Sequence, residues 1–207
     1  MVQGLLGKKM GMTHLYKDGK EVPVTAIEAG PCFVTQVKTQ EKDGYNTAQL
    51  AFETTKRLNA PLKGHLKELG LFKHLREFKV DDIKSVKMGQ KVDVDMFKAG
   101  DVVNISGVSK GRGFAGGVKR YHFKGGPKTH GQSDRQRAPG AVGSTTSPGR
   151  VFKGLRMAGH MGNRRVTVRG LVVVDIDLEH HVMLVKGAVP GAKSGLLLIK
   201  KASKGKK

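Results

Sequence analysis

The chain has 207 residues, with 38 Lys and Arg against 17 Asp and Glu, and a formal net charge of +21. This length allows one substantial domain with a large insertion and a genuine hydrophobic core. A charge of this size repels itself when the chain compacts, so it indicates a polyanionic partner and disfavours the alternative of a merely basic soluble protein.

The sequence carries no signal for a membrane or a disulfide. No stretch approaches the roughly 20 consecutive apolar residues that span a bilayer, and the Gly-rich start at 1–11 does not resemble a signal peptide. We therefore expect a cytoplasmic protein with no membrane partner. The single cysteine, Cys32, excludes an internal disulfide and a cysteine-based zinc cluster, and its strand-like setting predicts a buried structural thiol.

Short strands with turn signals fill residues 1–106. Asp18-Gly19 and Asp43-Gly44 each stand between runs of alternating apolar residues, the pattern of a hairpin turn. More strands follow at 166–200, where runs rich in β-branched residues flank a polar turn at 177–180. Because each set has too few strands to close a sheet alone, we expect the two to combine into one mainly β domain, an antiparallel barrel or sandwich.

One stretch in the first part has helical character, at 60–80. Pro61 suits the start of a helix, and Gly70 suits its end. The stretch predicts a small α-containing insertion at about 57–85.

A Gly-rich basic extension, residues 107–165, lies between the two sets of strands. It carries 13 Lys and Arg, a single acid (Asp134) and 14 of the 29 glycines. Ordering a backbone costs about 1–2 kcal/mol per residue, and this segment has few apolar side chains to offset that cost. We expect it to be irregular and extended, and mobile until a partner holds it. A second basic run, 201–207, forms a tail.

The run Gly111-Arg112-Gly113-Phe114-Ala115-Gly116 matches the G-x-G-x-x-G pattern of a dinucleotide-binding turn. Such a turn works between a strand and a helix whose N-terminus faces a pyrophosphate. Paired glycines and Pro127 follow where that helix is needed, which disfavours the alternative of a nucleotide-dependent enzyme. The RNA-recognition-motif signature fails too, because Gly116 and Lys119 replace its later aromatics. The scattered histidines support no metal site, so we expect neither cofactor nor metal.

Direct binding of nucleic acid is the remaining interpretation of the extension. Its cations supply charge, and its glycines let the backbone approach phosphates closely. We expect Phe114 to pack at the base of the extension, whereas Tyr121 leaves packing and base stacking both open. The predicted RNA-binding residues are Ser109, Lys110, Gly111, Arg112, Gly113, Phe114, Gly116, Lys119, Arg120, Tyr121, Lys124, Lys128, His130, Arg135, Arg137, Arg150, Lys153, Arg156, His160, Arg164 and Arg165.

A series of motifs in a fixed order runs through nearly the whole chain. A signature at 97–120 consists of Phe97, Asn104, Gly107, Ser109, Gly111-Arg112-Gly113, Gly116 and Arg120. The other motifs are GLLGKKMGMT, PVTAIEAGPCFVTQVKT, PLKGHLK, SPGRVFKGLRMAGHMGNRRVTV and LVKGAVPGAKSG. Together they resemble those of the bacterial large-subunit ribosomal protein three family.

That resemblance implies a closed translation-protein β-barrel whose extension enters ribosomal RNA towards the peptidyl transferase centre. It implies binding near the 3′ end of the large-subunit RNA, a role in nucleating subunit assembly, and neighbouring ribosomal proteins as further partners. Catalysis would belong to the RNA, so the chain is expected to be a scaffold and not an enzyme, with no small-molecule substrate. A general nucleic-acid compaction protein remains an alternative.

The resemblance also implies which residues form the tip of the extension, within 140–149. Thr146 stands at the position where some relatives carry a methylated glutamine, so that modification is not expected here, and Tyr121 replaces a frequent tryptophan. The tip residues expected nearest the peptidyl transferase centre are Gly143, Ser144, Thr145, Thr146, Ser147 and Pro148.

Overall fold

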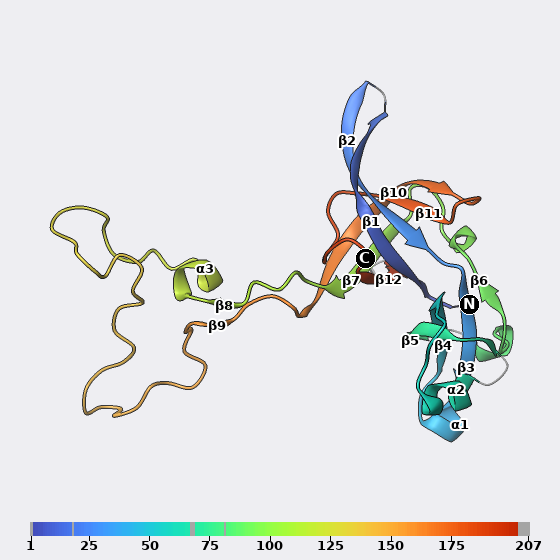
Figure 1. Cartoon of the computed structure of the whole chain (residues 1–207), viewed down its shortest axis with the longest axis horizontal. Coiled ribbons are helices and arrows are strands. Elements are labelled where there is room, and N and C mark those ends of the chain that lie inside the picture. Colours follow the sequence, from blue (N-terminus) through green and yellow to red (C-terminus); the bar gives the residue numbers. More distant parts are fainter. Residues whose placement is uncertain (1, 18, 67–68, 81, 203–207) are drawn as a thin grey trace, which may run out of the picture. The chain divides into compact units, whose positions relative to one another are not determined.

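The structure is a computed structural model that describes residues 2–17, 19–66, 69–80 and 82–202. The chain divides into two compact units: a barrel unit, Met1–Ser109 with Arg165–Lys207, and an extension unit, Lys110–Arg164. Figure 1 labels the helices and strands of both. Strands far outnumber helices among the described residues, which confirms the prediction of a mainly β protein. Most of the predicted tail, 203–207, lies outside the described residues.

Six strands of the barrel unit pair into a ring. Neighbours run antiparallel in the order β1-β12-β7-β10-β11-β2, and β2 pairs again with β1, which closes the barrel. A closed ring leaves none of these strands with an unpaired edge. The strands are β1 (Gly4–Lys17), β2 (Lys20–Ala29), β7 (Val102–Val108), β10 (Arg165–Asp177), β11 (Val182–Lys186) and β12 (Leu196–Lys201).

The ladder between β7 and β10 corrects the predicted ends of the extension. Arg165 pairs with Val108, and Val166 pairs with Gly107, so the ladder continues to the last residue of β7. A side chain at position 107 would lie 2.8 Å from Leu197, which explains the glycine there as a packing requirement. Gly107, Val108 and Arg165 are therefore barrel residues, although the sequence placed all three in the extension.

A second, four-stranded sheet lies in the barrel unit, in the order β5-β4-β3-β6. The sequence assigned residues 32–54 to the barrel, but these strands pair with β5 and β6 instead of with barrel strands. The strands of this sheet are β3 (Cys32–Lys38), β4 (Thr47–Thr54), β5 (Phe72–Lys79) and β6 (Lys91–Val92). Short helices connect them: α1 (Gln40–Asp43), α2 (Ala60–Leu66) and the 3-10 turn η2 (Ile83–Ser85). A further 3-10 turn, η3 (Val94–Met96), lies between β6 and β7.

The predicted helical stretch at 60–80 is only partly helical. Helix α2 covers its first seven residues, and Phe72–Lys79 forms strand β5. The strand prevails because it pairs along its whole length with β4, which buries Phe72 and Phe78. The Asp43-Gly44 turn also differs from a tight hairpin, because Asp43 ends α1 and Gly44 caps that helix with a φ of 79°.

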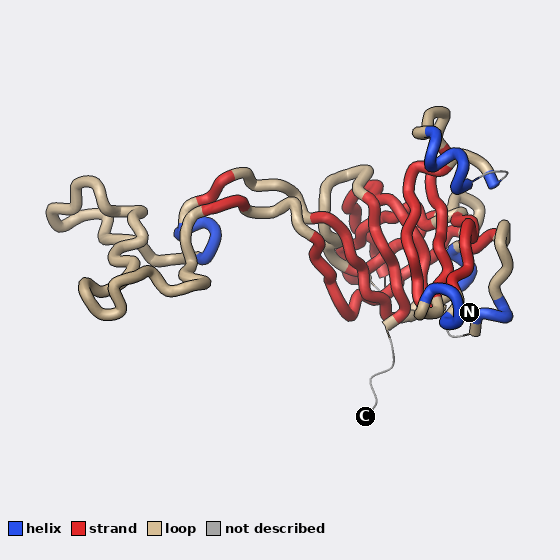
Figure 2. The backbone as a smooth tube through the Cα atoms, turned by 90° about the horizontal axis from the view of Figure 1, so that it is seen from below, coloured by secondary structure: helices blue, strands red, loops and turns tan. Residues whose placement is uncertain are grey.

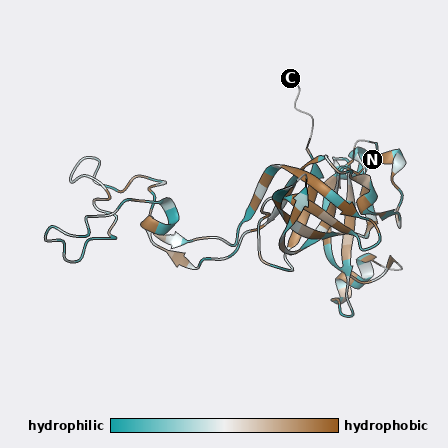
Figure 3. Cartoon of the chain, turned by 90° about the horizontal axis from the view of Figure 1, so that it is seen from above, coloured by the Kyte–Doolittle hydropathy of each residue, from teal (hydrophilic) through white to brown (hydrophobic). Residues whose placement is uncertain are grey.

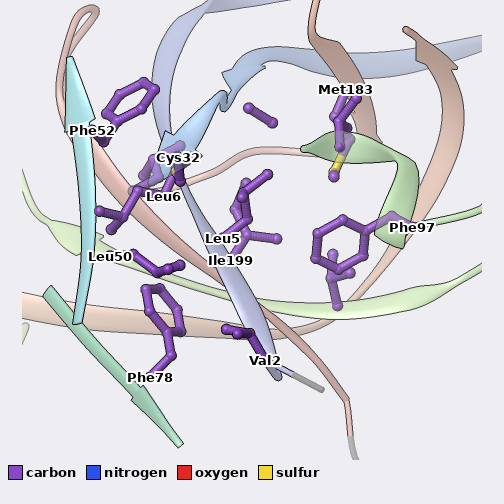
Figure 4. Packing of buried hydrophobic residues seen from close by; sticks show 14 of the residues in the cluster. Val2, Leu5, Leu6, Cys32, Leu50, Phe52, Phe78, Phe97, Met183 and Ile199 are labelled. Carbon is purple, nitrogen blue, oxygen red and sulfur yellow. Dashed lines mark hydrogen bonds between the residues drawn. The ribbon is translucent and has the colours of Figure 1, made fainter. Parts of the chain in front are cut away.

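One hydrophobic core joins the barrel to the second sheet. Leu5 and Ile199 of the barrel and Leu50 and Phe78 of the second sheet belong to a single cluster of buried side chains (Figure 4). All four are fully buried. Cys32 lies in the same cluster, which confirms the predicted structural thiol, and burial raises the pKa of this thiol to about 12.

A small ionic cluster also connects the two sheets. The Glu53 carboxylate of β4 accepts hydrogen bonds from Lys8 of β1 at 2.9 Å and from Lys73 of β5 at 3.2 Å. His74 Nε2 lies 3.5 Å from the same carboxylate. The bond from Lys8 is the main reason that the pKa of Glu53 lies below its ordinary value, and that bond also raises the pKa of Lys8.

The extension unit consists mostly of loops (Figure 2). Its regular elements are β8 (Phe114–Ala115), α3 (Gly117–Tyr121) and β9 (Gly159–His160). Brown, apolar stretches alternate with teal ones along the barrel strands in Figure 3, whereas among residues 110–164 only Ala115 is buried. The irregular backbone agrees with the sequence analysis, and mobility of the free extension stays a prediction.

Candidate nucleic-acid interface

The predicted RNA-binding residues are almost all exposed. Of the twelve Lys and Arg in 110–164, eleven are exposed and Arg120 is half-buried. Asp134, the one acid of the unit, lies 3.9 Å from Arg135, and both side chains are more than four-fifths exposed. Charges so exposed gain little from such a pair, so the cations of the extension keep almost their full field for an external anion.

The base of the extension unit is a two-stranded antiparallel ribbon, residues 110–115 with 159–162. Phe114 pairs with His160, and Ala115 pairs with Gly159. The backbone N–H of Arg112 donates to the Met161 carbonyl at 2.8 Å, and the Met161 N–H donates to the Gly113 carbonyl at 2.9 Å. A side chain at position 162 would collide with the backbone at 110–112, so glycine is required for this close approach. The ribbon holds this part of the G-x-G-x-x-G run in a defined conformation.

Phe114 does not pack as the sequence analysis expected. Its side chain is 80% exposed, although it lies on a hydrogen-bonded strand. The reason is the alternation of the ribbon: its neighbour Ala115 occupies the inward face, so Phe114 must point outward.

Tyr121 is engaged within the extension unit. The Arg120 guanidinium lies 5.0 Å and the Arg156 guanidinium 5.7 Å from the centre of its ring. The Phe123 ring stacks on it with centres 5.8 Å apart, and Arg120 donates to the Met157 carbonyl at 2.8 Å. Of the two possibilities that the sequence left open, the structure favours packing, against partners inside the extension.

A second backbone closure lies further along the unit. The Gly126 N–H donates to the Gln136 carbonyl at 2.9 Å, and neither Gly125 nor Gly126 has room for a side chain. With its amide oriented to accept, Gln132 bonds to the backbone N–H groups of residues 135 and 136 at 2.7 and 3.0 Å. The resulting loop exposes Arg135 and Arg137.

The remaining predicted residues are exposed on loops or at the ends of the unit. This group consists of Lys110, Lys119 in α3, Lys124, Lys128, His130, Arg150, Lys153, Arg164 and Arg165 at the start of β10. Ser109, the last residue of the barrel unit before the extension, is half-buried. The tip residues Gly143, Ser144, Thr145, Thr146, Ser147 and Pro148 are exposed as well.

Sequence reasoning missed the residues that organise the unit. Phe123 stacks on Tyr121, and the Met157 carbonyl accepts a hydrogen bond from Arg120. Gly159 leaves room for the Arg120 guanidinium, and the backbone of Met161 bonds across the ribbon. Arg120 and Met157 are 37 positions apart, so no local pattern could connect them.

The G-x-G-x-x-G run contains a strand, β8, and a helix, α3, follows it, contrary to the expectation that no helix follows. The strand has two residues and pairs antiparallel, and α3 has only five. A dinucleotide site needs a parallel βαβ unit, and every strand pair between described residues is antiparallel. Residues 2–17, 19–66, 69–80 and 82–202 also contain no group of three metal-ligating side chains and no helix long and apolar enough to span a membrane.

A closed barrel interrupted by a Gly-rich cationic insertion defines the class: a β-barrel protein with an exposed basic extension. A family model described as ribosomal protein L3 matches residues 62–180. The chain is 56% identical over 205 residues to the large ribosomal subunit protein uL3 of Dehalococcoides mccartyi, covering 99% of this chain and 100% of that protein. It is 55% identical over 211 residues to the protein of the same name from Herpetosiphon aurantiacus, with both chains fully covered. A third relative, from Thermotoga petrophila, is 51% identical over 205 residues, 98% of this chain and 99% of its own. The chain belongs to the ribosomal protein L3 family.

Proposed function

We propose that the protein is a structural constituent of the large ribosomal subunit and binds large-subunit ribosomal RNA through the extension unit. The observation that carries this proposal is the set of eleven exposed Lys and Arg on a unit with one buried residue. Phosphates are the anions that such a surface fits, because Arg and Lys neutralise them and glycine admits the backbone to them. Membership of the family supports the choice of ribosomal RNA among polyanions.

The finer parts of the proposal follow from the family. The barrel is assigned the translation-protein fold and binds near the 3′ end of the large-subunit RNA, where the protein nucleates assembly beside neighbouring ribosomal proteins. The tip residues 143–148 support the peptidyl transferase centre. The protein acts as a cytoplasmic scaffold in the subunit, without catalysis, cofactor or small-molecule substrate.

The test compares three polyanions of equal length: the 3′ region of large-subunit RNA, an unrelated RNA and duplex DNA. We expect the first to bind most tightly, and crosslinks from residues 110–164 to map to large-subunit RNA in assembled particles. If about ten cations neutralise phosphates, the logarithm of the binding constant falls with the logarithm of salt concentration with a slope of about −7 to −9.

Two results would replace the proposal. Equal affinity for all three polyanions would identify a general compaction protein. Saturable binding of a dinucleotide in equilibrium dialysis, lost when Gly113 is substituted, would support the nucleotide-dependent enzyme.

A further inference from the structure

The ribbon at the base of the extension unit has two faces with opposite character. On one face Ala115 is 4% exposed, and the Arg120 guanidinium covers Gly159 so closely that an added side chain would lie 2.7 Å from it. On the other face Phe114 and His160 stand directly opposite each other, and both are exposed. Side chains opposite each other in an antiparallel pair have Cβ atoms about 4.5–5.5 Å apart. The outer face therefore carries two exposed aromatic residues at directly opposite positions.

We propose that Phe114 and His160 form a stacking platform for one unpaired RNA base. This inference rests on the proposed function and adds to it the kind of RNA element that the ribbon contacts. Stacking on an aromatic ring needs no particular base, because every base has a π-face. The platform thus selects unpaired nucleotides and leaves their identity open.

The surroundings of the two rings favour a nucleotide over other partners. Lys110 and Arg112 are exposed in the segment just before β8, and the only acid of the unit, Asp134, is distant in sequence. A protein partner would need an interface of about 800 Å² on each side, far larger than two rings provide. A regular duplex offers no free base face, since its bases are stacked on each other. A splayed base with its phosphate meets both the rings and the cations.

Phe114 is better placed for this role than the other aromatics of the unit. Tyr121 already contacts Arg120, Arg156 and Phe123 through its ring. Phe152 is 58% exposed but lies in a loop outside any strand. Phe114 alone among them combines an open ring with a strand fixed by backbone hydrogen bonds, so less ordering is needed when a base binds.

The experiment uses the full-length protein and two RNAs of one sequence, a fully paired duplex and the same duplex with a single bulged 2-aminopurine. Three variants distinguish the effect of an aromatic ring from that of apolar surface area: Phe114→Ala, Phe114→Leu and Phe114→Trp. We expect Ala and Leu to lower affinity for the bulged RNA by about 5- to 100-fold and Trp to retain it, because stacking depends on the ring. His160→Ala should cause a smaller loss. Affinity for the paired duplex and the salt slope should not change, since no charge is removed.

Fluorescence of the bulged 2-aminopurine gives a direct readout. The wild-type protein should quench it, and Phe114→Leu should not. Protection of the Arg112 and Met161 amides from hydrogen exchange verifies that each variant keeps the ribbon. Equal affinity of Leu and wild type for the bulged RNA, or an equal loss on both RNAs, overturns the platform alone. Failure of the wild-type protein to bind either RNA overturns the proposed function together with the platform.

Discussion

The barrel unit and the extension unit treat their charges in opposite ways. In the barrel unit, cations and acids form close pairs, as between Lys38 and Glu77 at 2.6 Å and between Lys91 and Asp93 at 2.7 Å. In residues 110–164, Asp134 and Arg135 lie 3.9 Å apart, and both side chains are more than four-fifths exposed. Every buried apolar side chain of the described residues except Ala115 also belongs to the barrel unit. The barrel unit thus pairs several of its charges internally, whereas the extension unit leaves eleven of its twelve cations exposed.

The largest effect is expected from removing the extension. Val108 and Arg165 are paired across neighbouring strands, so replacing residues 109–164 by Asn-Gly should give a two-residue hairpin turn. We expect the barrel unit to fold with at least its original stability, while affinity for large-subunit RNA falls by more than about 1000-fold at 0.1 M salt. Circular dichroism and filter binding measure the two quantities. A variant that unfolds would show that the barrel depends on the extension.

Substitution of a phenylalanine should lower the free energy of unfolding far more in the barrel unit than in the extension unit. Phe78→Ala removes a fully buried ring from the shared core and should lower the free energy of unfolding by about 3–5 kcal/mol. Phe152→Ala, at a side chain that is 58% exposed, should change it by less than about 0.5 kcal/mol. Urea unfolding compares the two. Similar losses would mean that the extension contributes to the core.

The Tyr121 cluster should matter locally and leave the barrel unaffected. Tyr121→Leu removes the ring that Arg120 and Arg156 contact, each contact contributing about 0.5–1 kcal/mol. Hydrogen exchange at the Arg120 amide, which donates to the Gly116 carbonyl, should accelerate about 5- to 20-fold. Tyr121→Phe keeps the ring and serves as the control. Unchanged exchange in the Leu variant would show that the ring does not hold α3.

The smallest effect is expected at the ionic cluster between the sheets. Glu53→Gln should lower stability at pH 7 by less than about 1 kcal/mol, because the pairs are partly exposed. The pKa of Glu53 is lowered in the folded state, so its contribution is present above its ordinary value near 4.5 and is lost as the pH falls through the folded value. The difference between wild type and variant should therefore shrink between pH 5 and pH 3 in urea titrations. A difference that grows on acidification would contradict this assignment.

Local signals in the sequence predicted which segments form strands better than they predicted which strands pair. Alternating runs identified strands, and Cys32 was correctly predicted to be buried. The separate sheet of β3, β4, β5 and β6 could not be foreseen, because strand partners are chosen by packing across long separations. The stretch Phe72–Lys79 shows the limit most clearly: it lies within the segment expected to have helical character, and it pairs with β4 as a strand.

At the candidate nucleic-acid interface, too, the local composition was predictable and the long-range contacts were not. Charge and glycine counts indicated which segment offers its cations, and the positions of those cations in sequence were enough to propose them as ligands of phosphate. The outward turn of Phe114 was not predictable, because it depends on a ladder with His160, which is 46 positions away. The contacts of Tyr121 with Arg156 have the same origin.

The closures of the extension are nested, and this has a consequence for the order of folding. Joining Val108 to Arg165 with 56 free residues between them costs about 3 kcal/mol more than closing a two-residue turn. Once that pair has formed, the Phe114–His160 pair needs only a few further residues on each side to be fixed, and the Arg120–Met157 and Gly126–Gln136 contacts follow in turn. We expect pulse-labelled amides of β7 and β10 to become protected first and those at 126 and 136 last. The chain would then zip outward from the barrel, so that the segment from 126 to 136, which carries Lys128 and Arg135, is still open when it first meets its partner.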